Sequence, residues 1–221
     1  MPILDALQSE PFQLYYRALP SAIFNTLLIT ALSLVLGAIL GLGLAIMRLS
    51  RIRPLSTAAR IVIDVGRSIP ILVVLYLVYF GILALVFAIP PVAAAILAIG
   101  LKLGVYMAEL FRSGISAVPR GQIEAAHALG MSGRRVQRRI VVPIAIRLML
   151  PAIGQYSVGT LLDSSFASVI GAPEITSRSR NIIDLFFTTE LWILVAATYV
   201  LLAFPMSRLF VQLERRYALS L

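Results

Sequence analysis

The stretch that decides the fold runs from Ser68 to Leu101 and reads SIPILVVLYLVYFGILALVFAIPPVAAAILAIGL. It contains no charged residue. A helix that crosses the roughly 30 Å hydrocarbon core of a bilayer needs about 20 apolar residues, so this stretch is too long for one crossing. Because Pro90-Pro91 interrupts it, we expect two spans, one ending near Ala88 and one running from about Pro91 to Phe111.

Three further segments have the length and hydropathy of membrane spans: about Pro20 to Met47, about Ile140 to Leu162, and about Leu191 to Phe210. The first of them contains Gly37, Gly41 and Gly43, at spacings that favour close helix packing. We therefore predict an all-α, polytopic membrane protein with about five transmembrane helices. Residues 1–19 would precede the first span on the extracytoplasmic side.

The start of the second span is ambiguous. Arg60, Asp64 and Arg67 fall at helical spacing on one face, just before the apolar stretch. They fit either an interfacial turn or the cytoplasmic end of a long span.

The composition excludes other classes of protein. The chain has 221 residues, of which 60% are hydrophobic and 13% charged, and its mean hydropathy is +0.95. A soluble domain averages about 45–50% apolar and about 25% charged residues, and disordered chains are poor in apolar residues. The net charge of +9 would suggest nucleic acid in a soluble chain, but in a membrane protein it indicates cytoplasmic loops, so we expect no nucleic-acid partner. The absence of cysteine excludes disulfides and thiolate chemistry.

The distribution of cations predicts the orientation. Segments 48–53, 112–139 and 208–221 hold three, six and three Lys or Arg residues, twelve together. The opposite side holds only Arg17, Arg178 and Arg180. Cytoplasmic loops carry the excess of positive charge. The N-terminus is therefore expected outside and the C-terminus in the cytoplasm, in a multi-pass protein of the cytoplasmic membrane.

The loop between the third and fourth spans, about 112–143, contains the segment PRGQIEAAHALGMSGRRVQRRIVVP at residues 119–143. Pro119 suits the first position of a helix and Gly130 suits the position after its end, so a short cytoplasmic helix is expected between them. The small side chains of Ala125 and Ala126, with Glu124 beside them, suit docking into a partner's cleft. The alternative is a plain connecting helix.

This loop resembles the EAA loop of permease subunits of ATP-binding-cassette (ABC) importers. The residues that carry the resemblance are Glu124-Ala125-Ala126, Gly130 and Ile140-x-x-Pro143, with Val142 where the family has Leu. Two further segments, Tyr106–Gln122 and Asp163–Thr176, resemble motifs of the polar-amino-acid uptake branch, which includes histidine, glutamine and arginine permeases. The resemblance covers about residues 20–217, which we take as one permease domain.

The resemblance implies a type I importer fold and a set of partners. Two permease chains would pair, as a homodimer or with a sister chain, and an ABC ATPase dimer would seat Glu124, Ala125, Ala126, Gly130 and Pro143 of each coupling loop. An extracytoplasmic binding protein would deliver substrate. The sequence contains no phosphate-binding loop of the pattern G-x-x-x-x-G-K-[ST], so we expect no cofactor on this chain, with ATP and Mg²⁺ held by the partner ATPase.

Charged residues inside spans are costly and mark functional sites. Lys102 lies in the third span and Asp163 at the outer end of the fourth, next to Ser164. With Arg67, these residues are the candidates for the substrate path, in which Asp163 would meet an ammonium group and Lys102 a carboxylate. The alternative for Lys102 is to snorkel, or to pair with Asp163 in a purely structural salt bridge.

We expect neither catalytic residues nor a metal site. Ser164 and Ser165 lack a neighbouring base, and His127 is the only histidine, with no cluster of metal-ligating residues around it. The sequence thus predicts a transport subunit that is not itself an enzyme. Two alternatives stay open: a membrane scaffold whose helix only docks a partner, and a transporter or channel that works without ATP.

Overall fold

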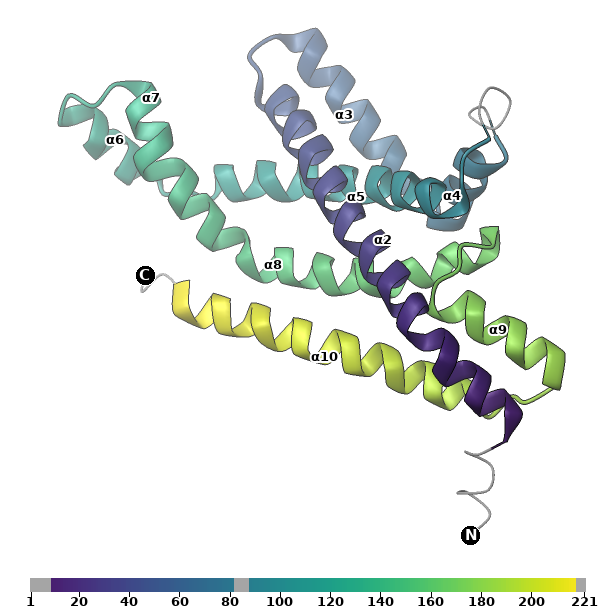
Figure 1. Cartoon of the computed structure of the whole chain (residues 1–221). Coiled ribbons are helices and arrows are strands. Elements are labelled where there is room, and N and C mark those ends of the chain that lie inside the picture. The colour runs from purple at the N-terminus through teal and green to yellow at the C-terminus, as the bar shows by residue number, and fades with distance from the viewer. Residues whose placement is uncertain (1–8, 82–87, 218–221) are drawn as a thin grey trace.

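The computed structural model describes residues 9–81 and 88–217, and the described parts are helical without a strand (Figure 1). The elements in chain order are α2 Glu10–Leu49, α3 Arg53–Ser68, α4 Ile71–Tyr79, α5 Pro91–Ser116, α6 Arg120–Ala128, α7 Gly133–Val136, a π-helical turn Gln137–Val141, α8 Val142–Asp163, a 3₁₀ segment Ser164–Ile170, α9 Ile175–Phe186 and α10 Leu191–Tyr217. Four stretches are long and apolar enough to cross a membrane, and the bent pair α3–α4 is a possible fifth. The all-α polytopic fold is therefore confirmed.

The first span is longer than expected. α2 has 40 residues, about 60 Å at 1.5 Å per residue, and Pro20 lies inside it rather than at its start. The reason is packing: the hydroxyl oxygen of Tyr15 lies 2.7 Å from the hydroxyl oxygen of Thr198 on α10, and both side chains are buried. Residues 10–19 thus belong to the same helix as the span, which begins earlier than the expected Pro20. The extracytoplasmic position of residues 1–19 stays a prediction, and residues 1–8 lie outside the described part.

α2 and α5 form the most extensive helix pair, and glycines make their close approach possible. A Cβ atom on Gly41 would lie 2.5 Å from the Cβ of Met107, and one on Gly37 would lie 2.7 Å from the Cγ of Leu103. The two glycines therefore act as the spacing predicted. Gly43 does not, because nothing lies within 4 Å of the place where its Cβ would be.

The second span is broken rather than continuous. α3 and α4 meet at an angle of 102°, with Ile69 and Pro70 in extended backbone between them. Proline has no N–H to continue the helix and disfavours helical backbone at the residue before it, so Ile69-Pro70 ends α3. Arg60, Asp64 and Arg67 lie on α3, which is a helix of 16 residues and not a single turn. Residues 82–87, just before the predicted end near Ala88, lie outside the described part.

The outer connection between α8 and α10 is anchored by a buried acid. Glu174 is fully buried and caps α9: its carboxylate accepts hydrogen bonds from the N–H groups of Thr176, at 2.8 Å, and Ser177, at 2.7 Å. The hydroxyl of Tyr199 on α10 donates a third bond at 2.8 Å. This acid ties the start of α9 to α10.

Candidate functional site: a coupling helix and a charged central cavity

The predicted cytoplasmic helix is α6, and it ends as the sequence indicates. Gly130 has a φ of +75°, a left-handed conformation that glycine adopts without strain. The N–H of Gly130 donates to the carbonyl of His127 at 2.9 Å, and the N–H of Met131 donates to the carbonyl of Ala126 at 3.1 Å. The second of these bonds closes the end of the helix as in a Schellman motif. Pro119 precedes the helix instead of occupying its first turn.

Ala125 and Ala126 of α6 differ in exposure. Ala126 is 3% exposed and belongs to a cluster with Val136 and Val141, so it packs against its own chain. Glu124 and Ala125 are exposed. The expectation that both alanines present a bare face to a partner is therefore wrong for Ala126. Leu129, which the sequence reasoning passed over, is 84% exposed at the end of the helix.

Pro143 accounts for the junction between this helix and α8. A proline at this position cannot donate to the carbonyl of Arg139. The chain forms a π-helical turn immediately before it, in which the N–H of Val142 donates to the carbonyl of Gln137. α7, the π turn and α8 form one stretch that crosses from the coupling segment to Asp163 (Figure 1). Pro143 thus shapes the connection and is not a contact surface of α6.

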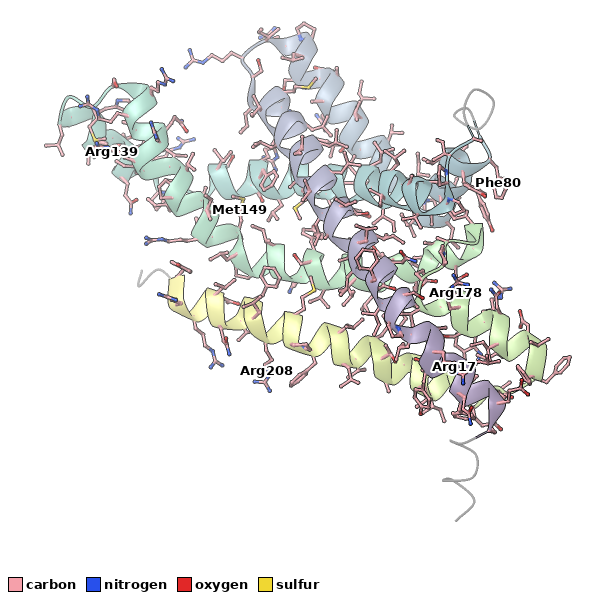
Figure 2. All side chains as sticks on the ribbon, in the orientation of Figure 1. Arg17, Phe80, Arg139, Met149, Arg178 and Arg208 are labelled. Atoms are coloured by element: carbon pink, nitrogen blue, oxygen red, sulfur yellow. The ribbon has the colours of Figure 1, made fainter. Side chains whose placement is uncertain are left out.

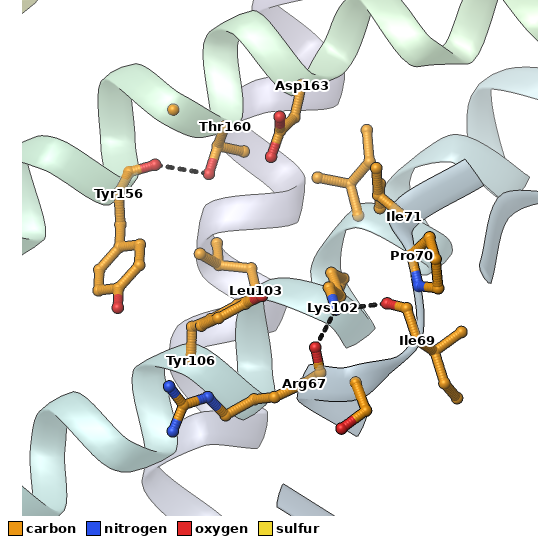
Figure 3. Close-up of a pocket in the computed structure, with 13 residues that line it drawn as sticks. Arg67, Ile69, Pro70, Ile71, Lys102, Leu103, Tyr106, Tyr156, Thr160 and Asp163 are labelled. Carbon is orange, nitrogen blue, oxygen red and sulfur yellow. Dashed lines mark hydrogen bonds between the residues drawn. The ribbon is translucent and has the colours of Figure 1, made fainter. Parts of the chain in front are cut away.

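A cavity of about 530 Å³ lies between the α3–α4 break, α5 and α8, and we call it the central cavity (Figure 3). Three of the four candidate substrate-path residues line it: Arg67, Lys102 and Asp163. Ser164 does not, since its side chain is fully buried and its hydroxyl donates to the carbonyl of Leu161 at 2.6 Å. That candidate is corrected.

The ammonium group of Lys102 is bound by backbone. Its Nζ atom donates to the carbonyls of Gly66, Arg67 and Ile69 at 3.1, 3.0 and 2.5 Å. These carbonyls belong to the end of α3 and the break that follows, where helical carbonyls lack partners and favour a cation. The structural alternative of a Lys102–Asp163 salt bridge is not supported, because no such pair forms among the described residues.

Asp163 stands opposite this cation without a direct partner. Its side chain is partly exposed, and within residues 9–81 and 88–217 nothing forms a hydrogen bond or an ion pair with it. In Figure 3, Asp163 comes from α8 on one side of the cavity, while Lys102 and Arg67 come from the other. The cavity therefore has a negative wall and a positive wall.

Two tyrosines, Tyr106 and Tyr156, also line the central cavity, and the sequence analysis did not select them as candidates. The Lys102 Nζ atom lies 5.1 Å and the Arg67 guanidinium carbon 5.6 Å from the centre of the Tyr106 ring. Tyr156 approaches Tyr106 with ring centres 6.0 Å apart. The distances from both cations to Tyr106 fall within the range of cation–π attraction. The i, i+4 spacing of Lys102 and Tyr106 was the available signal.

Comparisons with known proteins agree with this arrangement. Residues 33–219 match the family described as binding-protein-dependent transport system inner membrane component. The octopine transport system permease protein OccM of Rhizobium radiobacter is 37% identical over 209 residues, which are 90% of this chain and 85% of that protein. The nopaline transport system permease protein NocM of Agrobacterium fabrum is 36% identical over 205 residues, 88% of this chain and 85% of that protein.

A solved structure shows the same fold. The crystal structure of an amino acid ABC transporter with histidines contains a chain that is 35% identical, with a TM-score of 0.83, covering 92% of this chain and 94% of that one. The helices and the break thus define the type I permease fold of ABC importers. The chain belongs to the family of binding-protein-dependent transport system inner membrane components and is a membrane-embedded permease subunit of an ABC importer.

Proposed function

We propose that this permease imports a polar amino acid, or a close derivative of one, through the central cavity. One observation supports this class of substrate: the carboxylate of Asp163, which has no hydrogen bond or ion pair among the described residues, faces Lys102 and Arg67 across the cavity. An amino acid carries an ammonium and a carboxylate, and each needs an opposite charge in a low-dielectric passage. The names of the relatives, which refer to transport of octopine, nopaline and an amino acid, point to the same class.

In this proposal the three charged residues have different tasks. Asp163 accepts the substrate's ammonium group. Arg67 donates to its carboxylate, because its guanidinium has five N–H donors and forms no ion pair in the described part of the chain. Lys102 contributes charge but uses its three donors on the end of α3. It therefore holds the α3–α4 break in place, which modifies the expectation that Lys102 itself binds the carboxylate.

Transport is driven by a separate ATPase. The chain lacks a phosphate-binding loop, so the proposal places ATP and Mg²⁺ on an ATPase dimer that receives α6. Glu124, Ala125 and Leu129 form the face for this docking, since all three are exposed. Gly130 ends the helix, and Pro143 and the π turn pass its movement to α8.

The proposed assembly also contains a second permease chain and an extracytoplasmic binding protein. Arg139 lies at the end of the molecule near α6, whereas Arg17 and Arg178 lie at the opposite end (Figure 2). This separation, with the twelve-to-three cation bias, supports an extracytoplasmic N-terminus and a cytoplasmic C-terminus. Reporter fusions after Arg53, after Pro90 and at Leu221 test it: a cytoplasmic signal at Pro90 or an external one at Leu221 would contradict the orientation.

The experiment for the function is uptake into proteoliposomes that contain the permease, its ATPase and its binding protein. Radiolabelled octopine, nopaline, histidine, arginine and glutamine are supplied outside, with ATP or no nucleotide inside. The proposal predicts ATP-dependent accumulation of at least one compound, and its loss in Asp163→Asn. Equal uptake without ATP would favour an independent transporter or channel. A complex that assembles but imports none of the compounds would favour a scaffold and contradict the proposal.

A further inference from the structure

A second charged cavity, of about 160 Å³, lies where α2, α3 and α5 meet near the α2–α3 loop. We call it the lower cavity, because it lies on the side of the α2–α3 loop, which is expected to be cytoplasmic; in Figure 1 that loop is at the top. Its lining is mostly charged and consists of Arg48, Arg60, Ile63, Asp64, Arg67, Glu109 and Arg112. Four arginines and two acids give this small space a surplus of two positive charges, and among the arginines only Arg67 has been given a role above.

Two of the four arginines of the lower cavity form ion pairs. Arg60 pairs with Asp64, with Nε and Oδ2 3.4 Å apart. Arg112 binds Glu109 with both carboxylate oxygens, at 3.1 and 3.0 Å from its Nε atom. Arg48 and Arg67 have no acid of their own among the described residues.

Arg48 is held in place by a neutral group. Its Nη1 atom donates to the hydroxyl oxygen of Ser56 at 3.1 Å, and this hydroxyl donates back to the carbonyl of Arg48 at 2.9 Å. The side chain is partly buried. Arg48 forms no ion pair in the part of the chain that the structure describes, and Glu109, an acid of the same cavity that feels its charge, is already bound by Arg112. An oriented cation of this kind in a recess can bind an anion.

The lower cavity and the central cavity share a lining residue. A third recess, of about 400 Å³, is lined by Asp64, Arg67, Ser68 and Tyr106. Ser68 and Tyr106 also line the central cavity, Asp64 also lines the lower one, and Arg67 lines all three. Arg67 is therefore placed to contact a molecule in either cavity.

We propose that the lower cavity is a second binding station for the carboxylate of the imported compound, which Arg67 passes on from the central cavity to Arg48. The proposal rests on the proposed function, because it takes the central cavity as the substrate path. The lower cavity has the volume of about five water molecules, enough for a carboxylate with part of its backbone. Positive side chains in both cavities, Arg67 and then Arg48, keep the carboxylate opposite a counter-charge along the way.

The first test needs no knowledge of the substrate. The chain contains no cysteine, so a single introduced thiol can be labelled without background. Asp64→Cys reports on the lower cavity. Asp184→Cys is its matched control, because Asp184 also pairs with an arginine four residues earlier and is similarly exposed, at 69% against 64%, but lies on α9. Each variant, in the assembled importer in nanodiscs, reacts with an anionic or a cationic methanethiosulfonate of similar size.

If the lower cavity binds anions, the ratio of anionic to cationic labelling rates should be about fivefold higher in Asp64→Cys than in Asp184→Cys. The reason is that Arg48 and Arg67, two positive charges without an ion pair among the described residues, line the cavity near Asp64. Adding Arg48→Gln to Asp64→Cys lowers the ratio by about half or more, whereas adding Arg51→Gln, which removes an exposed positive charge outside the cavity, changes it much less. Equal ratios in the two cysteine variants overturn the station even if import is normal. A high ratio with no import in the panel contradicts the proposed function instead.

The second test is uptake of whichever panel compound the wild-type complex imports, in liposomes of phosphatidylcholine with and without phosphatidylglycerol. Arg48→Gln is expected to reduce the maximal rate about fivefold with an unchanged KM, since the binding protein still delivers substrate. Arg48→Lys retains most of the rate. Arg51→Gln, an exposed cation of the same loop outside the cavity, keeps the wild-type rate. A normal rate in Arg48→Gln, or a loss only with the anionic lipid, overturns the proposal.

Discussion

Two carboxylates that follow one another along the chain show how differently this fold treats charge. Glu174 is fully buried and accepts three hydrogen bonds, from Thr176, Ser177 and Tyr199. Asp163 is partly exposed to the central cavity and accepts none from the described residues. The first acid is satisfied by the protein's own atoms, whereas in the proposed function the second binds the substrate.

The difference separates structure from transport. A buried acid with three donors fixes the join between α9 and α10, and its removal is a matter of stability. An acid in a span that has neither a hydrogen bond nor an ion pair within the described residues is a candidate functional residue. The following predictions test this division.

The largest effect is expected at Asp163. Asp163→Asn should lower ATP-driven uptake by about 100-fold, which corresponds to the loss of a charge interaction of roughly 3 kcal/mol. The melting temperature and the basal ATPase activity of the complex should stay close to wild type. Uptake and melting are measured on one preparation; a loss of both together would make Asp163 a structural acid like Glu174.

The second largest effect is expected at Leu129, the exposed leucine at the end of α6. Leu129→Asp should weaken binding of the ATPase by about 30-fold, because a leucine that is 84% exposed in the chain would no longer be buried by a partner. Leu185→Asp, which changes a leucine that is 68% exposed on α9, is the control. Co-purification of the ATPase with each variant measures the difference. Retention in Leu129→Asp would place the docking face elsewhere.

Ala125→Arg and Ala126→Arg separate docking from packing, because Ala125 is exposed and Ala126 packs inside its own chain. We expect Ala125→Arg to insert normally and to lose the ATPase, while Ala126→Arg loses stability first. The two melting temperatures, compared before any partner is added, decide between these effects.

Glu174→Gln should lower stability and leave transport unchanged, whereas Asp163→Asn should lower transport and leave stability unchanged. The amide presents N–H groups where the carboxylate accepts them, which destabilises the structure by about 1–3 kcal/mol. Thermal unfolding in detergent should show a lower melting temperature, and the folded fraction should transport normally per molecule. An unchanged melting temperature would mean that the network around Glu174 does not stabilise the fold.

The smallest effect concerns pH. Burial raises the pKa of Glu174 above its usual value, although the N–H groups of Thr176 and Ser177 oppose the shift. Because the folded state then binds the proton more tightly than the unfolded state, this group loses stability as the pH rises through the window from its ordinary pKa to the raised one. The melting temperature of wild type minus that of Glu174→Gln should therefore fall across this window. A difference that rises with pH would give the shift the opposite sign.

The sequence predicted the parts of the fold that depend on local pattern. Apolar runs indicated the spans, Pro90-Pro91 indicated the start of α5, and Gly130 indicated the end of α6. The extent of α2 was not predicted, because the contact of Tyr15 with Thr198 joins opposite ends of the chain.

The candidate site divides in the same way. Arg67, Lys102 and Asp163 were selected because charge is rare in spans, and the structure brings them to one cavity. The carbonyl ligands of Lys102 were beyond sequence reasoning, since backbone groups more than thirty residues away carry no residue-type signal. The burial of Ser164 was missed for a related reason: its neighbour Asp163 faces the cavity, but the two side chains point in different directions.

The most direct test of the central claim is equilibrium binding of the imported panel compound to the assembled, nucleotide-free importer in nanodiscs, without the binding protein. The wild type and Glu174→Gln should bind it with equal affinity, and Asp163→Asn should bind it at least about tenfold more weakly. If Asp163→Asn binds as tightly as the wild type, the central cavity is not where the substrate's ammonium group is held.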